Sequence, residues 1–214
     1  MTRCVRVAVI DSGVHADHPH VGGVAGGIGI AADGRVDPDY VDRLGHGTAV
    51  AAVIREKAPA AGIYCIKVFD RELAATGKAL VAAIEKAIEQ RVEIINLSLG
   101  TQNRDHEPAL TSVVQEAAHA GAIVIAAGEQ DGVRWLPGAL PGVWPVMLDW
   151  TVPREECRVQ LRSGAAPVFY ACGLPRPIPG VPPERNLKGL SFAVANVTGL
   201  VAAAGAMLVA PQRN

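Results

Sequence analysis

The sequence predicts an α/β protein built on a mostly parallel β-sheet. Short apolar, β-branched runs alternate along the chain with stretches of helical period, which is the order expected of strands joined by crossover helices. Half of the 214 residues are hydrophobic but only 4% are aromatic, so Ala, Val, Ile and Leu must build the core. This aliphatic composition suits a sheet that is covered on both faces.

The first 130 residues contain the alternation. Its expected elements are a strand at residues 5–10, a strand at 62–68, a helix at 76–91, a strand at 92–97, a helix at 108–120 and a strand at 123–127. The helix at 76–91 shows the pattern well, because Leu80, Ile84 and Ile88 recur at helical spacing with charged residues between them. The first strand ends directly in Asp11-Ser12-Gly13, a tight-turn sequence.

The later part of the chain has a different composition. Ten of the fifteen prolines lie between Pro137 and Pro183, and this stretch shows little periodicity, so we expect loops and irregular strands of the same domain. The stretch from Phe192 to Pro211 carries no charge over about the length of a membrane span. Because it is rich in Ala and also contains polar residues, it predicts a buried core helix starting near Ser191. Residues 1–214 are therefore expected to form a single domain.

Charge and cysteine content exclude several function classes. Twenty basic and twenty-one acidic residues give a net charge of −1, which argues against nucleic acid and against an anionic membrane as partners. The four cysteines form no CxxC pair and read as small hydrophobic residues rather than a disulfide framework. The apolar run near the N-terminus is too short for the core of a signal peptide, so we expect a cytoplasmic protein.

Three polar residues stand where elements begin or end. Asp11 follows the first strand, His46 lies in Gly45-His46-Gly47-Thr48 at the start of an apolar helix, and Ser191 opens the uncharged helix. Each has a purely structural interpretation: a turn aspartate, a packed histidine and a helix-capping serine. Together they supply an acid, a base and a nucleophile at the carboxyl ends of a parallel sheet, where ligands bind.

These residues carry a resemblance to the subtilisin-like serine peptidases, the subtilase family. The segments 7–14, 45–48 and 189–193 resemble the regions around the family's aspartate, histidine and serine, in the same order. Residues 94–100 resemble its substrate-binding strand, and residues 123–128 resemble the strand that leads to its oxyanion asparagine. The matches extend from about Val5 to Met207 and imply the three-layer subtilisin-like fold.

The resemblance implies a serine endopeptidase that acts on a peptide or protein substrate. Ser191 would attack the peptide carbonyl, His46 would move the proton and Asp11 would orient and stabilise the imidazolium. The extended substrate would pair with Ser98, Leu99 and Gly100 as an added strand. The residues that would border the pocket for the side chain before the scissile bond are Ala126, Ala127 and Gly128.

The chain departs from the family pattern around the oxyanion site. Glu129 stands where the family has an asparagine, and an ionised carboxylate cannot donate a hydrogen bond to developing negative charge. Leu190 replaces a threonine, and Ala195-Asn196 replaces a Pro-His pair. Three explanations stay open: Gln130 supplies the amide after a one-residue shift, the enzyme is slow, or the protein is a catalytically silent peptide-binding module. A partner protein or a second subunit could also complete the site.

Other clusters suggest cofactors less strongly. His15, His18 and His20 could bind a metal but are expected to form a solvated loop. The aspartates at 33, 37, 39 and 42 suggest a calcium-binding loop, although their spacing matches no EF-hand. The glycines between residues 22 and 29 lack the order of a dinucleotide fingerprint. We therefore expect no metal and no cofactor. The short chain, with no propeptide before its first strand, suggests a minimal intracellular protease with a restricted substrate, such as one precursor peptide.

Overall fold

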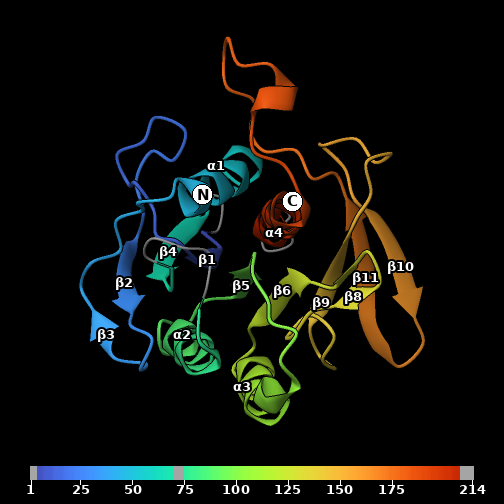
Figure 1. The fold of residues 1–214 in the computed structure, drawn as a ribbon. Helices are drawn as coiled ribbons and strands as arrows, with labels where there is room; N and C mark the ends of the chain where they lie inside the picture. The colour runs from blue at the N-terminus through green and yellow to red at the C-terminus, as the bar shows by residue number, and fades with distance from the viewer. Residues whose placement is uncertain (1–3, 70–74, 208–214) are drawn as a thin grey trace, which may run out of the picture.

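The chain folds around a nine-stranded β-sheet in a computed structural model that describes residues 4–69 and 75–207 (Figure 1). The strands, in their order across the sheet, are β10 (Arg158–Arg162), β11 (Ala165–Ala171), β9 (Trp144–Leu148), β6 (Ile123–Ala127), β5 (Ile94–Leu97), β1 (Arg6–Asp11), β4 (Gly62–Lys67), β2 (Gly26–Ile30) and β3 (Val36–Asp37). Neighbours run parallel except at the two edges, where β10 is antiparallel to β11 and β3 to β2. A separate hairpin joins β7 (Glu129–Gln130) to β8 (Val133–Arg134).

Helices cover both faces of the sheet. Figure 1 shows α1 (His46–Lys57) and α4 (Leu190–Met207) on one face, and α2 (Gly77–Glu89) and α3 (Glu107–His119) on the other. The side chains of β1 alternate between the two layers: Val7 and Val9 join the core under α1 and α4, whereas Ala8 and Ile10 join the core over α2 and α3. This arrangement confirms the predicted three-layer α/β fold.

The sequence explains where the helices on the second face begin. Thr76 caps α2, since its hydroxyl accepts a hydrogen bond from the Ala79 amide at 3.1 Å. Pro108 occupies the first turn of α3, where its missing amide hydrogen costs nothing. The helices and strands predicted between residues 5 and 127 are present, with ends that differ by at most two residues.

The uncharged helix α4 lies in the interior of the protein. By length and composition α4 could cross a membrane, and among the described residues it is the one helix for which this holds. Most of α4, however, is buried within the fold. It packs against α1 and also contacts β5, β6, β9 and β11. The predicted core helix is thus present over Leu190–Met207, and the last four residues of the predicted stretch lie outside the described part of the chain.

Two regions are more regular than the sequence suggested. The glycine-rich stretch contributes β2, which pairs in parallel with β4, and Gly27 is required there because a Cβ would overlap the Tyr40 ring. The proline-rich stretch contributes β9, β10 and β11 to the main sheet. Loops and irregular strands of the same domain were expected there; the strands are present, the β10–β11 pair has a register shift, and all three strands join the main sheet. Strand pairing supplied by distant residues overrides their weak local pattern.

Strand ends and helix starts converge at one edge of the sheet. Asp11 closes β1, Ser98 follows β5 and Gly128 follows β6, all at carboxyl ends of neighbouring parallel strands. The first residues of α1 and α4 lie at the same edge, because His46 contacts Asp11 at the end of β1 and Ser191 contacts Ser98 after β5. The fold therefore brings together polar residues that are far apart in the sequence.

Candidate active site

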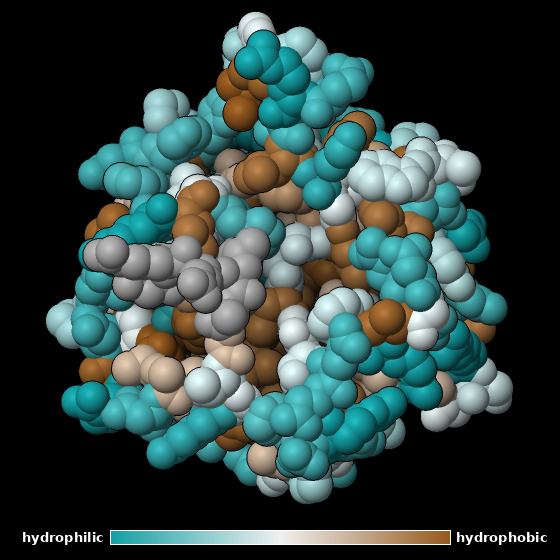
Figure 2. All heavy atoms as spheres, viewed as in Figure 1, coloured by the Kyte–Doolittle hydropathy of each residue, from teal (hydrophilic) through white to brown (hydrophobic). Residues whose placement is uncertain are grey.

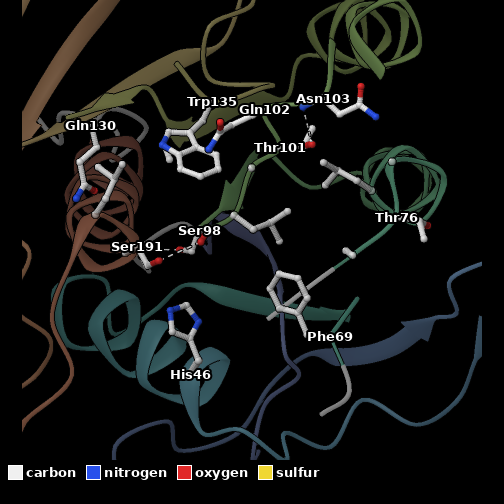
Figure 3. A pocket seen from close by; sticks show the side chains of 17 residues that line it. His46, Phe69, Thr76, Ser98, Thr101, Gln102, Asn103, Gln130, Trp135 and Ser191 are labelled. Atoms are coloured by element: carbon white, nitrogen blue, oxygen red, sulfur yellow. Dashed lines mark hydrogen bonds between the residues drawn. The ribbon is translucent and has the colours of Figure 1, made fainter. Parts of the chain in front are cut away.

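A cavity of about 660 Å³ opens at this edge of the sheet. Figure 2 shows the corresponding face hollowed near its centre, with apolar surface on the floor of the hollow. The residues that line the cavity are His46, Phe69, Ala75, Thr76, Gly77, Leu80, Ser98, Leu99, Gly100, Thr101, Gln102, Asn103, Ala127, Gln130, Trp135, Leu190 and Ser191. His46 and Ser191 thus share one cavity, and Figure 3 shows them on adjacent parts of its wall.

Asp11 and His46 form a buried hydrogen-bonded pair. The Asp11 Oδ1 and His46 Nδ1 atoms are 2.7 Å apart, and the Asp11 side chain is fully buried. The same Oδ1 accepts a hydrogen bond from the Ser12 amide at 2.7 Å. Asp11 is therefore both a turn aspartate and the partner of an imidazole. An aspartate at Nδ1 leaves Nε2 of His46 free to act on a second group.

The turn that presents His46 is organised by the buried carboxylate of Asp42. Its Oδ1 accepts from the Ser12 hydroxyl at 2.9 Å and from the amides of Leu44 and Gly45 at 2.9 and 2.8 Å. Its Oδ2 accepts from both the amide and the hydroxyl of Thr48, at 2.9 and 2.6 Å. Burial opposes ionisation of Asp42, but the hydrogen bonds from Thr48, Leu44 and Gly45 outweigh it and lower its pKa. Asp42 thus joins the end of β1 to the start of α1.

The charge state of His46 follows from its surroundings. Burial of the ring favours the neutral form, yet the hydrogen bond and the negative charge of Asp11, helped by the charge of Asp42, raise the pKa of His46 above 6.5. The imidazole also lies 5.5 Å, centroid to centroid, from the Phe192 ring on α4. His46 is therefore held between two helices, and its environment stabilises the imidazolium that would form after proton transfer.

Ser191 is the second residue of α4, not its N-cap, because the helix begins at Leu190. Its hydroxyl donates to the carbonyl oxygen of Ser98 at 3.0 Å, as Figure 3 marks. The turn before the helix uses Gly189, whose φ of 142° favours glycine. The Ser191 side chain therefore faces the end of β5 and the cavity rather than capping its own helix.

The other residues expected to bind substrate lie in different places. Ser98, Leu99, Gly100 and Ala127 line the cavity with Ser191. Ala126 instead packs in the core over α2 and α3 and does not border the cavity. Its side chain points away because side chains alternate along β6.

The two candidates for the oxyanion donor, Gln130 and Glu129, lie in different cavities. Gln130 lines the cavity that contains His46 and Ser191, whereas Glu129 is exposed and, with Gly128, lines a neighbouring cavity. The cause is local: residues 129 and 130 form the short strand β7, so consecutive side chains point to opposite sides. The Gln130 amide group donates to an Asp131 carboxylate oxygen at 3.2 Å.

The candidate metal ligands are engaged within the chain. Asp33 pairs with Arg35 at 2.6 Å, Asp39 with Arg43 at 2.7 Å and with Lys67 at 3.2 Å, and Asp42 holds the turn before α1. His15 and His18 are exposed, in line with a solvated loop. Within residues 4–69 and 75–207, no group of three His, Cys, Asp or Glu residues is arranged to hold a metal ion. Asp33, Asp39 and Asp42 thus accept hydrogen bonds from amides and side chains of this chain.

Sequence reasoning missed two parts of this site. Asp42 was considered as a calcium ligand, although an aspartate four residues before the first residue of a helix is a typical turn-capping signal. Trp135 lines the same cavity as Ser191, and its Cβ would meet a Cβ added at Gly100. No periodic pattern in the sequence marks Trp135, because it lies in the irregular segment after β8. The β-bridge between Thr101 and Leu136 holds this segment beside the cavity.

Comparison with known proteins identifies the family. The profile of the subtilase family, Peptidase S8, matches residues 2–149, which include Asp11, His46 and the segment Ser98–Gly100. The chain belongs to the subtilase family. Ser191 follows the matched range, so its assignment depends on the residues around it and on the geometry of α4.

This subtilase is similar to several bacterial proteases. It is 35% identical over 152 residues to a thermostable alkaline protease of Halalkalibacterium halodurans, covering 66% of this chain and 40% of that protein. It is 34% identical over 141 residues to an intracellular serine protease of Paenibacillus polymyxa, covering 61% and 43%. The chain thus spans less than half the length of these relatives.

Solved structures match more of the subtilase chain. The prenylagaramide maturation protease PagA superposes with a TM-score of 0.66 at 25% identity, covering 93% of this chain and 74% of that one. A lanthipeptide protease gives a TM-score of 0.70 at 22% identity, covering 93% and 72%. These likenesses confirm the subtilisin-like fold that the sequence predicted.

Proposed function

We propose that this subtilase is a serine endopeptidase in which Asp11, His46 and Ser191 act as the catalytic triad. The observation that carries the proposal is the buried Asp11–His46 pair, 2.7 Å between Oδ1 and Nδ1, on the wall of a cavity that Ser191 also lines. The raised pKa of His46 supports it, because a base that is stabilised when protonated accepts the serine proton more readily.

The reaction begins with rotation of the Ser191 side chain. Its hydroxyl turns from the Ser98 carbonyl to Nε2 of His46, which takes the proton as Oγ forms a bond to the peptide carbonyl carbon. Collapse of the tetrahedral intermediate breaks the C–N bond, and His46 returns the proton to the leaving amine. Water then hydrolyses the ester by the same proton route, which releases the acid and restores Ser191.

Rotation of Ser191 also frees an acceptor for the substrate. The Ser98 carbonyl loses its hydroxyl partner and can accept from a substrate amide as the peptide adds to residues 98–100. The residue before the scissile bond would then contact Ala127 and Trp135 on the cavity wall.

In the same proposal, the Gln130 side-chain amide stabilises the oxyanion in place of the family's asparagine. It lines the cavity beside Ser191, while Glu129 lines a different one. The amide must leave its partner Asp131 to reach the reacting oxygen. An amide donor serves this role because it supplies N–H without an opposing charge.

The proposed substrate is a precursor peptide in the cytoplasm. The likeness to PagA, which is named as a maturation protease, supports a processing role. The name of the Paenibacillus polymyxa relative, an intracellular serine protease, supports the location. A restricted substrate would also protect the cell from unregulated proteolysis.

Labelling with a fluorophosphonate probe tests the proposal, because the probe reacts with an activated serine. We expect the wild-type protein to be labelled and Ser191→Ala and His46→Ala to remain unlabelled. Ser191→Ala should keep the thermal unfolding midpoint within a few degrees of wild type, whereas His46→Ala should lower it, because the buried Asp11 carboxylate loses its imidazole partner. Hydrolysis of an internally quenched peptide should follow the labelling.

The outcomes separate the enzyme from a peptide-binding module. A wild-type protein that binds peptides but never reacts with the probe would support the catalytically silent alternative. Labelling that persists in Ser191→Ala would contradict the assignment of the nucleophile.

A further inference from the structure

Polar side chains with no contact to solvent connect the middle of α4 to the end of β5. Thr198 and Asn96 are both fully buried. The Thr198 hydroxyl donates to Asn96 Oδ1 at 2.9 Å, and the Asn96 side-chain amide donates to the Ser98 hydroxyl at 2.9 Å. Each hydrogen-bonding step runs in the same direction, from the helix toward the end of the strand.

This chain of hydrogen bonds ends on Ser191. The Ser98 hydroxyl donates to the backbone carbonyl of Ser191 at 3.1 Å, and the Ser191 hydroxyl donates back to the backbone carbonyl of Ser98 at 3.0 Å. The first turn of α4 is therefore tied to β5 by a reciprocal pair of bonds, as Figure 3 shows for the two serines. Thr198 sets the orientation of Asn96, Asn96 sets the Ser98 rotamer, and Ser98 fixes the Ser191 backbone.

The start of α4 needs such a tie, because the chain before it offers little support. The segment between β11 and α4 is rich in proline and contains a single short 3-10 helix, η2 (Pro183–Arg185), among its described elements. It ends in Gly189, the residue type with the most backbone freedom. The position of Ser191 therefore depends on its hydrogen bonds to Ser98 at the end of β5 rather than on the preceding chain.

Stability alone does not explain these residues. Buried hydroxyl and amide groups lose their bonds to water, so an apolar core of the same shape would be about equally stable. A fully bonded polar network instead selects one arrangement of its groups. All three side chains of the network have partners, whereas the buried side-chain atoms without one among the described residues are Asp11 Oδ2 and Asn196 Oδ1.

We propose that Thr198 and Asn96 are positioning residues, which act through Ser98 to hold the nucleophile Ser191 at the distance from His46 that catalysis needs. This inference rests on the proposed function, since it takes Ser191 as the nucleophile. Neither residue touches the substrate. Their loss should therefore lower kcat and leave KM nearly unchanged.

The matched pair Thr198→Val and Thr198→Ser tests the inference. Valine keeps the shape and removes the hydroxyl, whereas serine keeps the hydroxyl and loses a methyl group. We expect Thr198→Val to lower kcat about tenfold or more, because small displacements of reacting groups are costly, and to slow fluorophosphonate labelling in parallel. Thr198→Ser should restore most of the wild-type kcat, even though it leaves a small cavity.

A second break in the network covers the case in which Thr198→Val fails to fold. Ser98→Ala removes the donor to the Ser191 carbonyl but keeps the Ser98 carbonyl for the substrate, so kcat should fall by a similar factor at unchanged KM. In the double variant the two losses should not add, because one break already interrupts the network. Wild-type kcat in Ser98→Ala, or fully additive losses, would overturn the inference.

Val197→Ala is the control for a general loss of packing. Val197 is a fully buried neighbour on α4 outside the network, so its truncation should lower stability and leave kcat unchanged. An equal fall of kcat in Val197→Ala would contradict a specific positioning role.

The probe also separates failure of the proposed function from failure of the positioning role. If wild type and Thr198→Ser both fail to react with the probe, the proposed function fails. If both react and Thr198→Val reacts equally fast, only the positioning role fails.

Discussion

A single carboxylate oxygen organises the base of the proposed triad. Oδ1 of Asp11 accepts from both the Ser12 amide and His46, while Oδ2 is buried with no hydrogen-bond partner among the described residues. The negative charge of Asp11 is therefore compensated mainly by the groups at Oδ1. A buried, weakly compensated carboxylate favours a cationic partner, which is the imidazolium form of His46.

The pKa of His46 makes activity depend on pH in a predictable direction. Protonated His46 cannot accept the serine proton, so kcat/KM should fall as the pH drops through a midpoint above 6.5. NMR titration of Ser191→Ala should show the same midpoint for His46. His20 provides an internal reference, because burial, Arg176 and His18 lower its pKa below 6.5. A His46 midpoint at or below that of His20 would contradict the electrostatic argument.

Gln130 provides a second prediction for a single residue. If its amide stabilises the oxyanion, Gln130→Ala should lower kcat by about 10²-fold, with a smaller effect on KM; the magnitude comes from loss of the corresponding donor in subtilisin itself. Gln130→Glu should be at least as slow, because it keeps the size and replaces the donor with a charge. Steady-state kinetics would contradict the assignment if the loss appeared at Glu129→Ala and not at Gln130→Ala.

At the scale of elements, the proposed site requires α1 to approach the end of β1 very closely. Gly47 makes this possible, because a Cβ at this position would overlap the Gly13 carbonyl and would lie 3.1 Å from the Asp11 Cβ. The glycines on both sides of His46 thus have different roles. Gly45 adopts φ 82° in the turn, and Gly47 allows the helix to touch the strand.

Two glycine-to-alanine changes should shift stability in opposite directions. Gly47→Ala forces α1 away from β1 and should lower the free energy of unfolding by about 1–3 kcal/mol. Gly205→Ala lies in α4, where, within the described part of the chain, an added Cβ meets Val5 at an ordinary 3.6 Å, so it should raise the same quantity by about 0.5–1 kcal/mol. Urea unfolding of the two variants measures both values. A Gly47→Ala variant at least as stable as wild type would show that close approach is not what Gly47 provides.

At the scale of the whole molecule, the proposed site is assembled from strand ends that are distant in the sequence. The Asp11–His46 contact joins residues 35 apart, and the Ser98–Ser191 contact joins residues 93 apart. The parallel sheet makes both possible, because β1 and β5 are neighbours whose carboxyl ends lie at one edge. The same topology places α1 and α4 side by side over these strands, as Figure 1 shows.

Much of this organisation could be predicted from the sequence, and some of it could not. The strand at residues 123–127 is correct to the residue, because an apolar β-branched run between two turns has few alternatives. The bounds of β2, β9 and β11 could not be predicted, because glycine and proline weaken the local signal. Pairing of β2 with β4, of β9 with β6 and of β11 with β9 supplies the stability instead. Ala126 was expected at the cavity, and only the pleat of β6 shows that it faces the core.

The amino-acid sequence by itself determined the layered fold, the family and the identity of the three proposed catalytic residues, since periodicity and local motifs act over short distances along the chain. The tertiary structure decided which side chains share the cavity. It separated Gln130 from Glu129, assigned Asp42 to the turn before α1 and linked Thr198 to Ser191 through Asn96. These relations depend on strand pairing and on the direction of each side chain, which arise only when distant segments pack together.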